Sequence, residues 1–165
     1  MKFGPVILMA CLAVTACSPK KPAGVCAPAS HNFWKGQAGV GFLTSGWSEP
    51  EPEFVWSNAA KTTLSLPNSI HGHAATLTFV VAPFLTSADQ VQDVKVSVGG
   101  KEVSSWRLAP AAQTVTVNLP DSATNDDPIV LEFSIANPRS PKDGGVSTDD
   151  RLLGFYLKSV KVDCA

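Results

Sequence analysis

Two consecutive glycines, Gly99 and Gly100, separate two runs in which apolar and polar residues alternate. The runs cover residues 91–98 and 101–108. Glycine adopts positive φ without a steric penalty, and a two-residue hairpin turn needs positive φ at one or both of its central positions. The sequence therefore predicts an antiparallel β-hairpin here, and a chain built around such a unit is expected to form antiparallel sheets.

Six further segments have the pattern of strands, because they are short, apolar or alternating, and bounded by turn residues. No window shows sustained helical periodicity, so the crossover helices of a parallel α/β fold are not expected. Pro83 indicates an edge position or a bulge near the end of its segment, and a change of phase near Lys158 and Ser159 predicts a bulge in the last one. Together with the hairpin, these segments give about eight strands and predict an all-β fold, an antiparallel β-sandwich with jelly-roll-like topology. The six segments are 54–56, 62–66, 74–84, 114–119, 129–135 and 152–162.

Residues 1–16 have the layout of a bacterial lipoprotein signal peptide. Lys2 supplies a positive start, and residues 6–14 form an apolar run too short to cross the hydrocarbon core as a helix. Small residues precede Cys17, whose thiol is expected to carry a diacylglyceryl group that anchors the chain in a membrane. Ser18, where an aspartate would indicate retention in the inner membrane, predicts the outer membrane in a bacterium with two membranes. The alternative is an ordinary secretory signal with an incidental cysteine.

The expected organisation has three parts. Residues 1–16 are the signal peptide, residues 17–35 are the lipidated cysteine and a tether, and residues 36–165 are the β-sandwich domain. The length that remains after the signal peptide is that of one domain.

Two of the four cysteines are available for a disulfide. Cys11 leaves with the signal peptide and Cys17 is acylated, so Cys26 and Cys164 remain. In an oxidising envelope compartment the simplest expectation is that these two pair, which would join the two ends of the domain. Unpaired or intermolecular thiols are the alternative.

The composition excludes several classes of function. The chain has 13 basic and 14 acidic side chains and no basic block, so nucleic acid is not an expected partner. It has no G-x-S-x-G elbow, no H-E-x-x-H motif and no phosphate loop, so we predict neither an enzyme nor a cofactor. His71 and His73 are too few for a closed zinc site, and the acidic loops lack EF-hand spacing. We therefore predict no metal.

Two separated motifs carry a family resemblance. The first begins Gly46-Trp47-Ser48-Glu49-Pro50-Glu51, and the second runs from Asn137-Pro138-Arg139-Ser140-Pro141 through Asp149-Asp150-Arg151 to Gly154. Over about residues 36–163 the chain resembles an all-β module appended to bacterial glycosyltransferases and phosphoglycerol transferases that make or modify cell-surface polysaccharide. The common pattern spaces the acid from the arginine, so Asp149 aligns with the family acid and Asp150 is the departure. The resemblance implies a carbohydrate-binding sandwich, and the enzyme portion is missing from this chain.

Sugar recognition combines an aromatic face for the C–H side of a pyranose with polar groups for its hydroxyls. Trp47 and Trp56 are candidates for the aromatic face, and packing in the core is the alternative role for both. A structural pair with Asp149 or Glu49 is the alternative role for Arg151. The candidate carbohydrate-binding residues are Trp47, Glu49, Glu51, Trp56, Asp149 and Arg151.

These inferences lead to one functional prediction and one alternative. The prediction is a membrane-anchored, non-catalytic lipoprotein that binds cell-surface polysaccharide or assists its assembly or retention. The alternative is a structural accessory lipoprotein of an envelope protein complex, with the sandwich as a protein-binding face. The expected partners are thus the membrane, through the lipid, and cell-surface glycan or envelope proteins.

Overall fold

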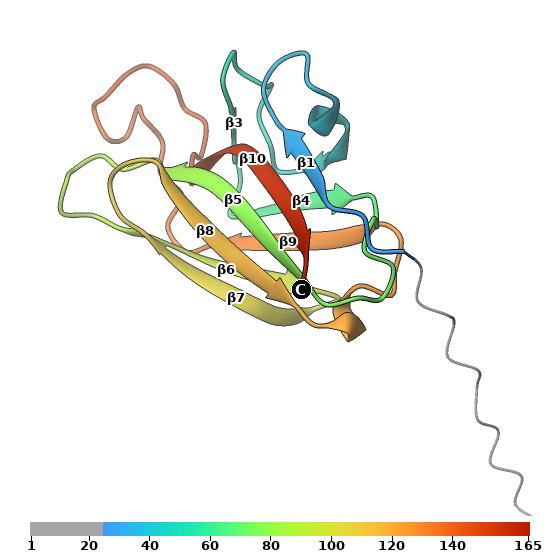
Figure 1. Ribbon diagram of the computed structural model, residues 1–165. Helices are drawn as coiled ribbons and strands as arrows, with labels where there is room; N and C mark the ends of the chain where they lie inside the picture. Colours follow the sequence, from blue (N-terminus) through green and yellow to red (C-terminus); the bar gives the residue numbers. More distant parts are fainter. Residues whose placement is uncertain (1–24) are drawn as a thin grey trace, which may run out of the picture.

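The computed structural model describes residues 25–165, which form two antiparallel five-stranded sheets packed face to face (Figure 1). The expected all-β sandwich is confirmed, with ten strands where the sequence predicted about eight. In the described residues, no helix is long and apolar enough to cross a membrane. The strands are β1 Ala29–Asn32, β2 Leu43–Ser45, β3 Val55–Trp56, β4 Lys61–Leu66, β5 Ala75–Pro83, β6 Gln92–Val98, β7 Lys101–Leu108, β8 Gln113–Leu119, β9 Ile129–Ile135 and β10 Phe155–Cys164; short 3-10 helices span η1 Ala38–Phe42 and η2 Asp121–Ala123.

The two sheets divide the strands between them. Sheet A has the order β1-β10-β5-β8, and β3 pairs with the start of β10; sheet B has the order β2-β4-β9-β6-β7. Alternate residues of each strand point between the sheets, as the two-residue period of a strand requires. Phe79 of β5, Phe133 of β9 and Phe155 of β10 are fully buried and form edge-on ring contacts in the centre of the core.

Two local predictions are confirmed. Val98 pairs with Lys101 across the β6–β7 turn, and Gly99 and Gly100 have φ of 57° and 77°. The register of β10 against β5 shifts between Leu157 and Ser159, at the predicted bulge.

Pro83 does not mark an edge strand. β5 lies between β10 and β8 in the middle of sheet A. Pro83 is the last residue of β5, two residues beyond the final pair with β8, which joins Val81 to Gln113. A proline, which cannot donate to a sheet, is tolerated there because the β8 ladder has already ended.

The folded region begins earlier than the expected boundary at residue 36. β1 pairs with the second half of β10, and the next residue, Phe33, is fully buried. Residues 29–33 therefore belong to the sandwich, although the sequence assigned them to the tether. The strand Ala29–Asn32 contains no large apolar residue that would mark it in the sequence, and its stability comes from its pairing with β10. The expected signal peptide and Cys17 lie outside the described residues.

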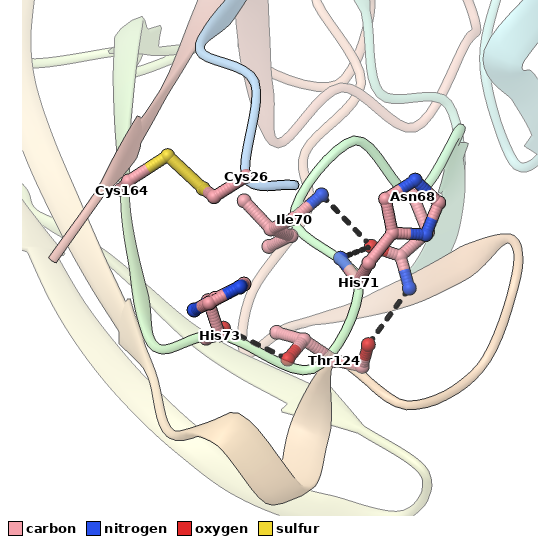
Figure 2. Close-up of a disulfide and its surroundings, with 7 residues drawn as sticks. All are labelled: Cys26, Asn68, Ile70, His71, His73, Thr124 and Cys164. Carbon is pink, nitrogen blue, oxygen red and sulfur yellow. Dashed lines mark hydrogen bonds between the residues drawn. A yellow bond between two sulfur atoms is a disulfide. The ribbon is translucent and has the colours of Figure 1, made fainter. Parts of the chain in front are cut away.

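The expected disulfide between Cys26 and Cys164 is present, with the two Cα atoms 6.2 Å apart (Figure 2). It joins the segment before β1 to the last residue of β10. Beside it, the Asn68 side-chain amide donates to the carbonyl oxygens of Thr124 and Asp126, at 2.7 Å each. We call this end of the sandwich the disulfide pole.

The opposite end, the loop pole, contains the long segments 46–58 and 138–154. They meet at the start of β10, where the Ser57 N–H donates to the Phe155 carbonyl oxygen at 2.9 Å. Ten residues of β10 connect the two poles, which places them about 30 Å apart.

Candidate functional site

Four aromatic side chains form a partly exposed cluster on the outer face of sheet A, at the loop pole. Val55 is fully buried, so the neighbouring Phe54 and Trp56 point outward, and Trp56 pairs with Tyr156 across β3 and β10. Phe84, just after β5, completes the group. We call these four residues, Phe54, Trp56, Phe84 and Tyr156, the aromatic cluster.

The rings of the aromatic cluster hold one another in place. Phe54 and Tyr156 stack with centroids 4.4 Å apart and planes 13° apart. Trp56 meets Tyr156 edge-on at 5.4 Å and Phe84 edge-on at 5.9 Å. Such pairs are stabilising and restrict the orientation of each ring. The cluster is therefore a preformed apolar surface.

In the described part of the chain, the polar groups of the cluster are not paired with one another or with their neighbours. Within residues 25–165, no hydrogen bond uses the indole N–H of Trp56 or the hydroxyl of Tyr156. Beside the cluster, Lys158 Nζ lies 3.8 Å from Glu53 Oε2. The site thus combines four partly exposed rings with one donor, one hydroxyl and a nearby ion pair.

Trp47, a predicted site residue, is used mainly for packing. Its ring contacts Phe133 and Phe155 edge-on, at 6.2 and 5.8 Å, and its indole N–H donates to the Thr63 carbonyl oxygen at 2.8 Å. The remaining exposed edge lines a shallow pocket of about 320 Å³, together with Glu49. Trp47 therefore closes the open end of the sandwich and contributes little ring face to solvent.

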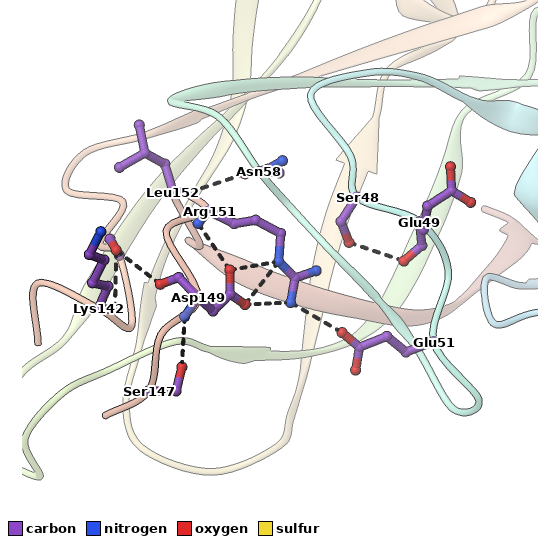
Figure 3. A network of polar contacts seen from close by, with 10 residues as sticks. Ser48, Glu49, Glu51, Asn58, Lys142, Ser147, Asp149, Arg151 and Leu152 are labelled. Atoms are coloured by element: carbon purple, nitrogen blue, oxygen red, sulfur yellow. Dashed lines mark hydrogen bonds and ion pairs between the residues drawn. The ribbon is translucent and has the colours of Figure 1, made fainter. Parts of the chain in front are cut away.

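Glu51, Asp149 and Arg151 form one network that joins the two sequence motifs (Figure 3). Arg151 Nη2 lies 2.6 Å from Asp149 Oδ2, and Arg151 Nε donates to the same oxygen at 2.9 Å. The same Nη2 lies 3.5 Å from Glu51 Oε1. Arg151 therefore forms the structural pair with Asp149 that the sequence offered as its alternative role. Its second acidic partner is Glu51, and not Glu49.

Charge and hydrogen bonding shift the pKa values within this network. Hydrogen bonds from the Arg151 side chain and backbone lower the pKa of Asp149, with a smaller contribution from the positive charge. The hydrogen bond from Asp149 raises the pKa of Arg151. The Arg151 guanidinium and the Asp149 carboxylate thus stabilise each other's charged forms, and the contacts of Arg151 with Asp149 and Glu51 join the loop 138–154 to the segment 46–58.

The structure brings some of the predicted residues together and separates others. Glu51, Asp149 and Arg151 share one network, Trp47 and Glu49 share one pocket, and Trp56 lies in the aromatic cluster. Phe54, Phe84 and Tyr156 were not predicted. The alternation of Phe54 and Trp56 about an inward Val55 was the available signal, but Phe84 and Tyr156 join them only through the pairing of strands.

Comparison with known proteins establishes the fold. No protein-family model matches the chain, and no curated protein matches it. The CBM22-2 xylan-binding domain of Paenibacillus barcinonensis Xyn10C aligns over 83% of this chain and 99% of its own, with 12% identity and a TM-score of 0.51. The CBM36-1 domain of a multidomain xylanase from the hindgut metagenome of Trinervitermes trinervoides aligns over 84% and 98%, with 12% identity and a TM-score of 0.47. The first of these two alignments shows that the chain shares the β-sandwich fold of that xylan-binding domain.

Proposed function

We propose that this chain is a membrane-anchored bacterial lipoprotein whose non-catalytic β-sandwich binds cell-surface polysaccharide and assists its assembly or retention. The observation that carries the proposal is the aromatic cluster, a preformed and partly exposed set of four rings on an open sheet face. The shared fold with a xylan-binding domain supports the same function.

The cluster has the chemistry that sugar binding needs. The C–H face of a pyranose packs on aromatic rings, and its hydroxyls need donors and acceptors at the ring edge. Trp56 supplies an N–H and Tyr156 a hydroxyl, and neither is used by another described residue. Because the rings already support one another, little side-chain entropy is lost when the ligand binds.

The described chain enters the fold at the disulfide pole, and the aromatic cluster lies at the loop pole. With a lipid on Cys17, residues 18–25 span at most about 30 Å before the fold begins. The disulfide pole then faces the membrane, and the aromatic cluster faces away from it. This orientation presents the binding face to polysaccharide outside the lipid surface.

The carboxylates that the two sequence motifs bring together are not free to act as a glycosidase pair. Asp149 and Glu51, the carboxylates that the two motifs bring together, are both paired with Arg151. A glycosidase instead needs two carboxyl groups free to flank the scissile bond.

The test is binding of polysaccharide extracted from the envelope of the producing bacterium, measured with the purified full-length chain. Trp56→Ala should weaken binding by about thirtyfold or more, as for a buried aromatic anchor of an interface. Val130→Ala, at an exposed apolar position on the outer face of sheet B, is the control and should bind normally. Absence of glycan binding, with co-purification of membrane proteins in mild detergent, would favour the accessory role instead.

A further inference from the structure

The outer face of sheet A continues from the aromatic cluster toward the disulfide pole as rows of hydroxyl and amide side chains. Register pairs fix which residues share this face, since partners in neighbouring strands point to the same side. Thr78 of β5 pairs with Thr116 of β8, and Thr76 pairs with Asn118. Thr76 Oγ1 donates to Asn118 Oδ1 at 3.1 Å, which confirms that these two side chains lie side by side. The outward residues of β5 and β8 are Thr76, Thr78, Val80, Ala82, Thr114, Thr116 and Asn118.

This face is open to solvent. Thr114, Thr116 and Asn118 are exposed, while Thr76 and Thr78 are partly exposed. No other described strand packs over them, because sheet B covers the opposite, inner face. In Figure 1, β5, β8 and β10 form one continuous curved surface between the poles. A ligand that starts at the aromatic cluster therefore meets no barrier along the strands.

The face carries almost no charge. β5 and β8 contribute no charged residue. β10 contributes Lys161 and Asp163, which pair with each other at 2.8 Å, and Lys158, which pairs with Glu53. Each charged side chain of β5, β8 and β10 thus has a partner of opposite charge, and these strands present no cluster of cations to an anionic ligand. Hydroxyl groups, in contrast, exchange hydrogen bonds with sugar hydroxyls and require no charged group to lose its water.

We infer that the aromatic cluster and the outward threonine and asparagine side chains of β5 and β8 form one binding track for an uncharged, extended polysaccharide that lies along these strands. This inference rests on the proposed function and names its ligand class. The rings at the loop pole hold one sugar unit by stacking, and the threonine and asparagine side chains bind the following units by hydrogen bonds. The chain of sugars runs from the loop pole toward the disulfide pole.

The test separates the extracted envelope polysaccharide by anion exchange into uncharged and acidic fractions. Each is presented to the full-length chain, purified in detergent, in biolayer interferometry. The expected result is binding of the uncharged fraction with an affinity that does not change between about 0.05 and 0.5 M salt. The double variant Thr78→Val with Thr116→Val should weaken this binding about tenfold, because two hydrogen-bonding groups are lost.

The matched control is Ser65→Val with Ser134→Val, which removes two hydroxyls from the outer face of sheet B. It should bind as the unmodified protein does. Valine suits strands well, so both double variants should fold, and their thermal unfolding checks this. Thr116→Val alone, at an exposed position, should act in the same direction with a smaller effect.

The outcomes separate the inference from the proposed function. Loss of binding in Trp56→Ala with no change in the threonine double variant would confine the ligand to the aromatic cluster and overturn the inference alone. Binding of the acidic fraction only would also overturn it. If the unmodified protein bound neither fraction, both the inference and the proposed function would be wrong.

Discussion

The outer faces of the two sheets are built on the same strand alternation and both carry hydroxyls, but they differ in charge and in aromatic content. Sheet B carries ion pairs between neighbouring strands, whereas β5 and β8 of sheet A carry no charged residue and the loop pole of sheet A carries the aromatic cluster. The ion pairs of sheet B are Lys61 with Glu132 at 3.0 Å, Lys95 with Glu102 at 3.1 Å and Arg107 with Asp93 at 3.9 Å. Exposed pairs of this kind add little stability, but a charged face resists association with other proteins. Sheet B is thus suited to solvent and sheet A to a ligand.

Among the substitutions that test the difference in charge between the two faces, adding a charge to the neutral strands of sheet A should have the largest effect. Thr116→Lys is expected to weaken binding of uncharged polysaccharide by about tenfold, because a lysine side chain must be displaced or desolvated. The same variant should gain affinity for acidic polysaccharide that falls with salt. Affinity measurements at two salt concentrations check both expectations.

Val130→Lys is the control for that experiment, since Val130 is an exposed outward residue of β9 in sheet B. Its affinity for uncharged polysaccharide should not change. Equal losses in Thr116→Lys and Val130→Lys would show that the two faces do not differ in binding.

Removing the guanidinium at the loop pole should have a smaller effect, on stability. Arg151→Met leaves Asp149 and Glu51 without their shared partner, and we expect the melting temperature to fall by about 2–4 °C. Calorimetry measures this. Arg107→Met, which breaks an exposed pair of sheet B, should change the melting temperature by less. Retained glycan binding in Arg151→Met is expected, because the network lies outside the binding track.

His31 should make stability depend on pH. Its Nε2 atom is buried with no hydrogen-bond partner, and burial lowers the pKa of this imidazole. The unfolded chain therefore binds a proton at a higher pH than the folded chain does. The free energy of unfolding should fall as the pH drops below about 6.5, the ordinary pKa of histidine. The loss should be complete once the pH is below the lowered pKa of His31 in the folded chain.

The measurement for His31 is urea unfolding at a series of pH values from neutral to mildly acidic. His31→Phe, which keeps an aromatic ring beside Phe42, should flatten the dependence in this range. The acid-side loss that comes from Asp149, whose pKa is lowered, belongs to a lower pH, below about 4. An unchanged slope in His31→Phe would assign the dependence to other groups.

The smallest effect is expected on sheet B. Lys61→Met removes one exposed ion pair, and the free energy of unfolding should change by less than about 0.5 kcal/mol. Denaturant titration at low and high salt measures this. A loss of more than 1 kcal/mol would mean that the charges of sheet B hold the sheet together, and the contrast between the faces would need another explanation.

Local chemistry made much of the fold predictable. The eight expected segments correspond to β3 through β10, because each contains an apolar, aromatic or alternating run that marks it in the sequence. The turn at Gly99 follows from glycine chemistry, and the bulge before Ser159 from the change of phase in the apolar pattern. β1 and β2 were not predicted, since Ala29–Asn32 contains no large apolar residue and Leu43–Ser45 contains only one. Their stability depends on β10 and β4, which lie far away in the sequence.

The candidate site was harder to predict, because it is assembled by the sheet. Trp47 and Trp56 are close in sequence, yet one packs against the core and the other lies on the outer face. The reason is that Trp47 belongs to the turn that closes the sandwich, whereas Trp56 is an outward residue of a strand that pairs with β10. Tyr156 and Phe84 reach Trp56 only through strand pairing, which no local pattern contains.

The disulfide also determines how the domain bears mechanical load. A pull that arrives through the chain before residue 25 enters the fold at Cys26, three residues before β1. Without the covalent link, that force would peel the four-residue β1 from β10 one hydrogen bond at a time. With it, the force passes directly to Cys164 and along β10, which is paired on both sides and must be sheared rather than unzipped. A pull between the chain before residue 25 and a glycan bound at the loop pole would thus be resisted by β10, the longest strand of the sandwich.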